Sequence, residues 1–410
     1  MRVQRPPGVS IEQIEGGVTA PSGFRAAGVA CGIKKTGAPD LALVVAGAPA
    51  PAAAVFTTNK AQAAPVLVSR EHLARSGGLA RAIVVNSGCA HACTGPEGMA
   101  VARSSADFVA SIVGCAPEQV LVASTGVIGV QLDLDKLRRG AGDAAKALSR
   151  EAHGDAARAI MTTDRAPKSA AVSVTTPSGT FRVGGMAKGA GMIEPHMATM
   201  LGFVTTDAAI AAPLLQRALR EAADVTFNAI TIDGDTSTND TVFLLASGAS
   251  GVRIDEAAYP AFAAALREVC GSLARAIVRG GEGATKLVAV SASGAASDAD
   301  ATRAAHTIAN SLLVKTAIHG GDPNWGRLLA AAGRAGVAFD VERATVRIGP
   351  VVLFKDGVPF DDRAPEAAAY LAGTDLEIEI GLGAGGPHAA TVWTCDLSAE
   401  YVAINADYRT

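Results

Sequence analysis

The sequence predicts a mixed α and β fold (α+β class) with a separate α+β domain at its C-terminal end. Short β-like runs alternate with segments of helical apolar spacing, but without the regular repeat of a βαβ protein. From Gly336 onward the pattern changes to short strands with a single helix. The chain has 410 residues, 49% of them apolar, which is enough for two or three domains with substantial cores.

The first two thirds of the chain carry the alternating elements. Strands are expected where short runs of β-branched and small apolar residues occur, at residues 41–46, 82–86, 119–123, 170–175, 180–183 and 199–206. Helices are expected where apolar residues recur every three or four positions, at residues 97–113, 134–148, 213–223, 256–278 and 298–313. Ser297 and Asp300 form a capping signature before the last of these helices. The Ala/Pro-rich residues 46–54 are expected to be a loop.

The C-terminal part is expected to hold strands at residues 337–341, 344–348, 351–354, 375–380 and 389–395, and a helix at residues 364–371. Between the last two strands, Gly381, Gly383 and Gly386 match the glycine spacing of a dinucleotide-binding loop. Pro387 and another β run follow, where such a site requires a helix. The sequence therefore predicts a strand-to-strand connection here.

Composition favours a small-molecule partner. The net charge is −3, aromatic residues make up only 4%, and no basic stripe with stacking residues is present for a nucleic acid. The N-terminus lacks the apolar core of a signal peptide, and residues 41–56 are interrupted by Pro49 and Pro51. We therefore expect no nucleic-acid or membrane partner, and a cytoplasmic protein whose six cysteines are reduced thiols.

Two segments have parts of a metal site. Cys89, His91 and Cys93 offer half of a zinc clip, but no second ligand pair is nearby and structural zinc takes four ligands. Residues 233–244 alternate oxygen ligands like a calcium loop, but Thr238 and Leu244 stand where glycine and glutamate are required. No metal is expected.

The strongest chemical signal is the stretch from Lys188 to Leu201, KGAGMIEPHMATML. It places the bond between Ala198 and Thr199 after a glycine-rich loop that can hold a strained backbone, and before an apolar run. Attack of the threonine hydroxyl on the Ala198 carbonyl would cut the chain. The new N-terminal threonine would supply a nucleophile and, through an α-amine with a pKa of about 7.7 to 8.0, its own base. Ordinary strand composition is the alternative interpretation of these residues.

Other polar, glycine-punctuated segments lie at or near the ends of apolar runs, where several of them could surround one pocket. They are residues 86–88, 124–126, 161–164, 188–189, 233–240, 281–283 and 324–327. Spacing alone does not choose among them.

With these segments in this order, the sequence resembles, over nearly its whole length, the glutamate/ornithine N-acetyltransferase family of the cyclic arginine-biosynthesis pathway. The similarity covers residues 188–201 together with 122–129, 161–164, 231–241, 281–286, 313–327 and 401–410. The resemblance implies an N-terminal-nucleophile-like layered core. It also implies an α chain, residues 1–198, and a β chain, residues 199–410, in which residues 199–290 complete the core and about 291–410 form the C-terminal α+β domain.

The resemblance further implies autocatalytic cleavage between Ala198 and Thr199, after which Thr199 carries acetyl from N2-acetyl-L-ornithine to L-glutamate in a ping-pong reaction. The oxyanion hole of the family matches Thr125 and Gly126. The implied substrate-binding residues are Thr162, Lys188, Thr199, Glu282, Asn405 and Thr410. No cofactor is implied, acetyl-CoA being an additional donor in bifunctional members. The two fragments are expected to stay together in an α2β2 heterotetramer.

The chain departs from the family pattern at several positions, which bears on acceptor preference more than on reaction type. Cys89 and His91 replace asparagines, Gly280 replaces a common aspartate, and His196 and His319 also replace other residues. Two other classes of protein stay open from the residues. One is an amidase or aminopeptidase on the same scaffold, in which water receives the acyl group. The other is an uncleaved, non-catalytic protein that binds amino acids.

Overall fold

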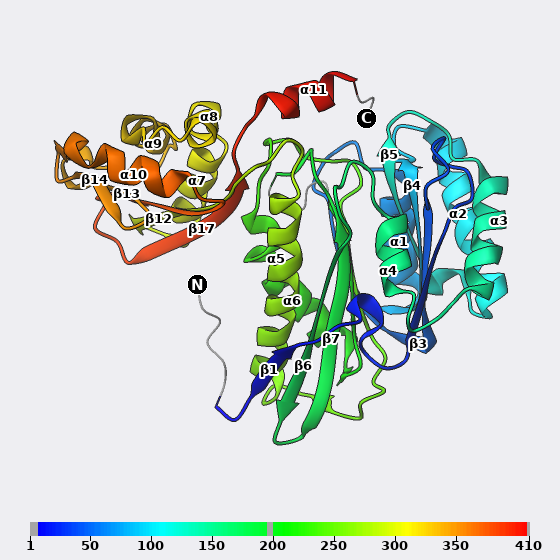
Figure 1. Ribbon diagram of the computed structural model, residues 1–410. Helices are drawn as coiled ribbons and strands as arrows, with labels where there is room; N and C mark the ends of the chain where they lie inside the picture. The colour runs from blue at the N-terminus through cyan, green and yellow to red at the C-terminus, as the bar shows by residue number, and fades with distance from the viewer. Residues whose placement is uncertain (1–6, 195–199, 408–410) are drawn as a thin grey trace.

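The structure is a computed structural model that describes residues 7–194 and 200–407 (Figure 1). Within these residues, one sheet of nine strands forms the first unit. Its strands are β1 (Ser10–Gln13), β2 (Phe24–Val29), β3 (Leu41–Phe56), β4 (Leu79–Cys89), β5 (Val120–Val127), β6 (Lys168–Thr176), β7 (Gly179–Lys188), β8 (Leu201–Thr206) and β10 (Thr241–Ala246). The order is β1-β6-β7-β8-β10-β3-β4-β5, with β2 paired to β3. The short strands β9 (Ala209–Ile210) and β11 (Arg253–Ile254) pair separately.

The long strand β3 divides this sheet into two halves that pack face to face. Its first part, around Val44, pairs with β2 and β4, and its last part, around Val55, pairs with β10. Side chains alternate between two cores along the strands, as the period of two requires. Phe203 of β8 and Phe243 of β10 face the core between the halves, while Val204 faces the opposite side. The first unit is therefore a sandwich whose two outer faces also need covering.

Helices cover both outer faces and give four layers. On one side lie α5 (Ala212–Asp224) and α6 (Tyr259–Arg279), and on the other α1 (Ala64–Arg75), α2 (Gly95–Val113) and α3 (Leu134–Lys146). The short α4 (His153–Ala159) contributes to the core between the halves. Proline stands in the first turn of α1, α2, α5 and α6, where its missing N–H costs no hydrogen bond. The predicted mixed α/β layered core is confirmed.

The second unit is built on a six-stranded sheet with its own core. Its strands are β12 (Leu287–Ala295), β13 (Thr345–Ile348), β14 (Val351–Lys355), β15 (Val358–Pro359), β16 (Asp375–Gly381) and β17 (His388–Cys395), and its helices are α7 (Asp298–Ala309), α8 (Leu312–Gly320), α9 (Trp325–Gly333) and α10 (Ala364–Leu371). After β17 the chain turns back, and α11 (Ala399–Asp407) runs toward the first unit (Figure 1). The Ser297 cap of α7 and the connection between β16 and β17 are confirmed.

Three local predictions were wrong. Residues 46–54 belong to β3 instead of a loop, because a register shift against β4 between Val45 and Ala50 accommodates Pro49 within the strand. Residues 298–313 form two helices, because α7 ends at Ala309 with Asn310 as its C-cap. The side chain of Asn310 is hydrogen-bonded to Glu194 and Thr231. Residues 337–341 form no strand, because the Asp340 carboxylate caps a short 3-10 turn at this point.

Candidate active site

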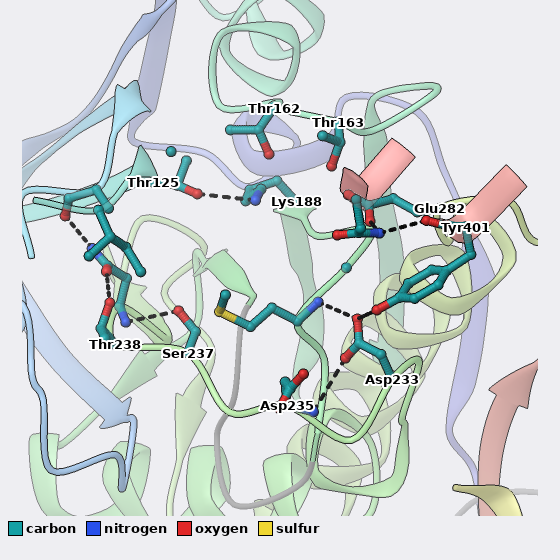
Figure 2. Close-up of a pocket in the computed structure, with 17 residues that line it drawn as sticks. Thr125, Thr162, Thr163, Lys188, Asp233, Asp235, Ser237, Thr238, Glu282 and Tyr401 are labelled. Carbon is teal, nitrogen blue, oxygen red and sulfur yellow. Dashed lines mark hydrogen bonds between the residues drawn. The ribbon is translucent and has the colours of Figure 1, made fainter. Parts of the chain in front are cut away.

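A cavity of about 220 Å³ opens where the ends of β5 and β7 meet the loop before β10 and the C-terminal helix α11 (Figure 2). Six of the predicted site residues line it: Thr125, Gly126, Thr162, Lys188, Glu282 and Asn405. They come from five separate segments of the chain, so the fold brings together residues that lie up to 280 positions apart. Ala198, Thr199 and Thr410 lie outside the described residues.

Thr125 and Gly126 lie near the end of β5, where its pairing with β4 becomes irregular. Gly126 has a φ of 127°, in the region that glycine adopts at no steric cost. A Cβ at this position would come within 2.6 Å of the Cys89 backbone nitrogen and would overlap the backbone of Gly88 as well. The β4–β5 pairing becomes irregular here, since Cys89 lies opposite both Thr125 and Val127. Only glycine fits at position 126 without displacing β4.

Lys188 ends β7 and points at the Thr125 hydroxyl. Its Nζ donates to Thr125 Oγ1 at 3.1 Å, and its side chain is buried (Figure 2). Burial lowers the pKa of Lys188, while the carboxylate of Asp164 acts in the opposite direction. Since an ammonium group can only donate, the Thr125 oxygen accepts this bond and its own O–H remains able to donate. The pair therefore presents a polarised hydroxyl donor next to the backbone N–H of Gly126.

Asp164 holds the surroundings of Lys188 in place. It accepts from the backbone N–H groups of Gly189 at 2.8 Å and Thr162 at 3.1 Å, and it forms a buried ion pair with Lys168. Burial would raise the pKa of Asp164, but Lys188 and Lys168 outweigh burial and bring that pKa to about 2. The carboxylate is thus ionised and fixes two of the predicted site residues, Thr162 and Lys188, relative to each other.

Asp233 is a pocket residue whose oxygens are already occupied by protein donors. It accepts from the backbone N–H groups of Met192 at 2.6 Å and Ile193 at 2.9 Å, and from the Tyr401 hydroxyl at 3.1 Å. Burial raises the pKa of Asp233, and these hydrogen bonds oppose that change. Asp233 therefore connects the segment before residue 195 to the C-terminal helix.

Glu282 and Asn405 close the pocket on the side of α11. Asn405 Nδ2 donates to Glu282 Oε2 at 2.8 Å, and Glu282 is buried. A Cβ on Gly191 would lie 2.5 Å from the Glu282 carboxylate, so the glycine makes room for it. The sequence did not single out Tyr401, although its position four residues before Asn405 puts both side chains on one face of a helix.

The described chain approaches the predicted cleavage site from both directions. Glu194 Oε2 accepts from Thr231 Oγ1 at 2.6 Å and from Asn310 Nδ2 at 2.8 Å. On the other side, the Met200 N–H donates to Asp240 Oδ1 at 2.7 Å, and Leu201 pairs with Lys188 across β7 and β8. Leu201, two residues after Thr199, thus lies directly opposite the pocket residue Lys188 in the neighbouring strand.

One candidate segment and one candidate metal ligand from the sequence, His91, are not among the residues that line the pocket. Residues 324–327 belong to the second unit, where Asn324 caps α9, and they do not line the pocket. His91 is buried, and desolvation lowers its pKa to about 4, so the imidazole is neutral at pH 7. No group of three or more metal-ligating side chains occurs among residues 7–194 and 200–407. No helix in this part of the chain is long and apolar enough to cross a membrane.

The fold and the pocket define an enzyme built on a layered α/β core, with polar groups converging at strand ends. The chain belongs to the ArgJ family, whose model matches residues 25–410. It is 49% identical to the arginine biosynthesis bifunctional protein ArgJ of Thermosynechococcus vestitus, over 97% of this chain and 99% of that protein. It is 50% identical to the protein of the same name from Nitratidesulfovibrio vulgaris, over 95% of this chain and 99% of that protein.

A solved relative matches part of the chain. The crystal structure of arginine biosynthesis bifunctional protein argJ from Bacillus halodurans is 44% identical, with a TM-score of 0.50. The match covers 51% of this chain and 100% of that chain. The solved chain is therefore about half as long as the protein described here.

Proposed function

We propose that this protein is a glutamate N-acetyltransferase of arginine biosynthesis, which transfers acetyl from N2-acetyl-L-ornithine to L-glutamate through an acetyl ester on Thr199. Membership of a family whose curated relatives are named for arginine biosynthesis supports the pathway. The observation that carries the reaction type is the hydrogen bond from Lys188 to Thr125 beside Gly126. It leaves the Thr125 O–H able to donate to an oxyanion together with the Gly126 N–H.

The first half-reaction forms the acetyl-enzyme. The Thr199 hydroxyl oxygen attacks the acetyl carbonyl carbon, and the α-amine of Thr199 takes the hydroxyl proton. Negative charge develops on the carbonyl oxygen, where the Thr125 O–H and the Gly126 N–H donate. The bond from the acetyl carbon to the ornithine nitrogen then breaks, this nitrogen receives the proton, and ornithine leaves.

The second half-reaction reverses these steps with another amine. The α-amino nitrogen of glutamate attacks the ester carbonyl, and the bond to Thr199 Oγ breaks. The proton lost by the amine returns to this oxygen, so Thr199 is regenerated and N-acetylglutamate is released. If a water molecule attacked in place of glutamate, acetate would be released and the enzyme would be an amidase. Transfer to glutamate rather than to water therefore depends on polar contacts that hold the amino acid in the site. We propose that these contacts come from Thr162, Lys188, Glu282, Asn405 and Thr410.

Self-cleavage between Ala198 and Thr199 is the step that would create the nucleophile. The solved relative from Bacillus halodurans, matched along its full length, corresponds to about half of this chain, which is the size of a fragment ending or beginning at such a cut. We also propose that the fragments associate as α2β2, and that acetyl-CoA is an additional acetyl donor.

Mass spectrometry and N-terminal sequencing of the purified protein, beside a Thr199→Ala variant, test the proposal. Two fragments beginning at Met1 and Thr199 are expected in the parent protein only, together with acetyl transfer from N-acetylornithine to glutamate. Release of acetate without N-acetylglutamate would identify an amidase. An uncut parent chain without transfer would indicate an amino-acid-binding protein. Repeating the assay with acetyl-CoA tests the second donor, and native mass measurement tests the assembly.

A further inference from the structure

Asn239 is a buried residue that lines the same pocket as Thr125 and Gly126, and both ends of its side-chain amide are hydrogen-bonded to the protein. Its Nδ2 donates to the carbonyl oxygens of Ala90 at 2.6 Å and Ser124 at 2.9 Å. Its Oδ1 accepts from the Thr238 hydroxyl at 2.6 Å. This pattern fixes the orientation of the amide, because a flipped amide would place its oxygen against two carbonyl oxygens.

The carbonyl that Asn239 holds belongs to the peptide plane immediately before Thr125. A second network fixes Ser124 through its side chain. Ser124 Oγ donates to Asn86 Oδ1 at 2.6 Å, and Asn86 Nδ2 donates to the Cys89 carbonyl at 2.9 Å. These side chains act where the β4–β5 ladder loses its regular register. They therefore add side-chain hydrogen bonds at the point where the pairing of the two strands becomes irregular.

We propose that Asn239 is a positioning residue for the oxyanion hole, which keeps the Thr125 hydroxyl and the Gly126 N–H aimed at one point by anchoring the Ser124 carbonyl. The inference rests on the proposed acetyl transfer. Oxyanion donors must stay within about 2.7 to 3.1 Å of the developing charge, and a displacement of about 1 Å can cost about 100-fold in rate. Asn239 is distinct from the donors themselves, because its amide faces the protein carbonyls.

The variant Asn239→Asp has nearly the same shape but replaces the donating amide nitrogen with an oxygen. The Ser124 and Ala90 carbonyls would then face an acceptor. Asn59→Asp is the matched control, because Asn59 Nδ2 donates to the Thr236 carbonyl at 2.8 Å in the same loop and is not a pocket-lining residue. Both variants lose an amide donor to a backbone carbonyl, but only Asn239→Asp releases the Ser124 carbonyl next to Thr125.

The expected result is a kcat about 100-fold lower for Asn239→Asp, with KM for N-acetylornithine and glutamate within about threefold of the parent. Asn59→Asp is expected to keep the parental kcat. Rates are expressed per cleaved site, counted by mass spectrometry from the fragment that begins at Thr199, acetylated or not. A parental kcat in Asn239→Asp, or equal losses in both variants, would overturn the inference.

A second variant and a second assay separate a loss of folding from a loss of catalysis. Asn239→Ala removes the amide without adding charge, and if both Asn239 variants fail to unfold cooperatively, the residue serves folding and the proposal is wrong. Hydrolysis of 4-nitrophenyl acetate reports acetyl-enzyme formation without either amino acid. A parent that hydrolyses this ester but transfers no acetyl between amino acids would refute the proposed function. The Asn239 variants would then be compared by their ester hydrolysis.

Discussion

The side-chain amide of Asn405 donates to the carboxylate of Glu282 at 2.8 Å, and this bond joins the C-terminal helix to the pocket wall. Helix α11 has no buried residue of its own, so its position depends on such polar contacts with the first unit. Tyr401, one turn earlier, contacts Asp233, and Glu400 pairs with Arg165 at 3.0 Å.

Replacement of Asn405 by alanine is therefore expected to weaken substrate binding. Asn405 is itself a proposed substrate contact, so the loss of one hydrogen bond of about 1.4 kcal/mol is expected to raise KM for N-acetylornithine about 10-fold. Steady-state kinetics measures it. Val402→Ala on the exposed side of the same helix serves as the control. An unchanged KM in Asn405→Ala would show that α11 does not contribute to binding.

Replacement of Thr125 by valine is expected to lower kcat by about 100-fold or more, because the hydroxyl that donates to the oxyanion is lost at nearly constant volume. Thr125→Ser keeps the hydroxyl and should recover most of the rate. Turnover per cleaved site, measured with saturating substrates, compares the two. Equal rates in the valine and serine variants would remove Thr125 from the oxyanion hole.

Replacement of Gly126 by alanine is expected to disturb the fold as well as the chemistry. The new Cβ would overlap the backbone of β4, and a φ of 127° is strained for alanine, so the free energy of unfolding should fall by about 2 to 5 kcal/mol. Gly129 also has a positive φ, but a Cβ added there would meet no atom within 4 Å. Gly129→Ala should therefore cost only about 1 to 2 kcal/mol in the same denaturation experiment.

The Asp164 carboxylate is expected to make stability fall in acid. Its folded-state pKa of about 2 lies below the ordinary value of 3.8, so its contribution is present above pH 3.8 and is lost as the pH falls toward 2. The contribution is on the order of 2 kcal/mol. Urea unfolding between pH 5 and about 2 measures it. Asp164→Asn should be less stable than the parent at neutral pH and should lose less stability on acidification; parallel curves would contradict this assignment.

Sequence patterns predicted most elements of the fold, because apolar periodicity reports burial directly. The pattern failed at residues 46–54, where prolines usually signal a loop, since the bulge in β3 depends on its pairing with β4. It also failed to predict the end of α7 at Asn310, whose side chain donates to Glu194 in the other unit. Both outcomes depend on contacts between distant segments, which no local pattern contains.

Most residues of the candidate site were predicted from the sequence, but their contacts were not. The family resemblance named six residues that the fold brings to one cavity, whereas the polar segments alone also included residues 324–327, which lie in the second unit. Asp164 and Asn239 stood within the polar segments, but their partners could not be deduced. The carbonyl of Ser124 becomes a partner of Asn239 only when β5 and the loop before β10 are packed together.

The strand order has a thermodynamic consequence for a chain cut before residue 199. Strands β8 and β10 come after the cut, yet they lie between β7 and β3, which come before it. Each fragment alone would thus leave a gap or an unpaired edge in the middle of the sheet. Unfolding of the cut protein becomes a dissociation, so its melting temperature should rise with protein concentration. The uncut Thr199→Ala chain should melt with a weaker dependence on concentration, because its two halves remain covalently joined.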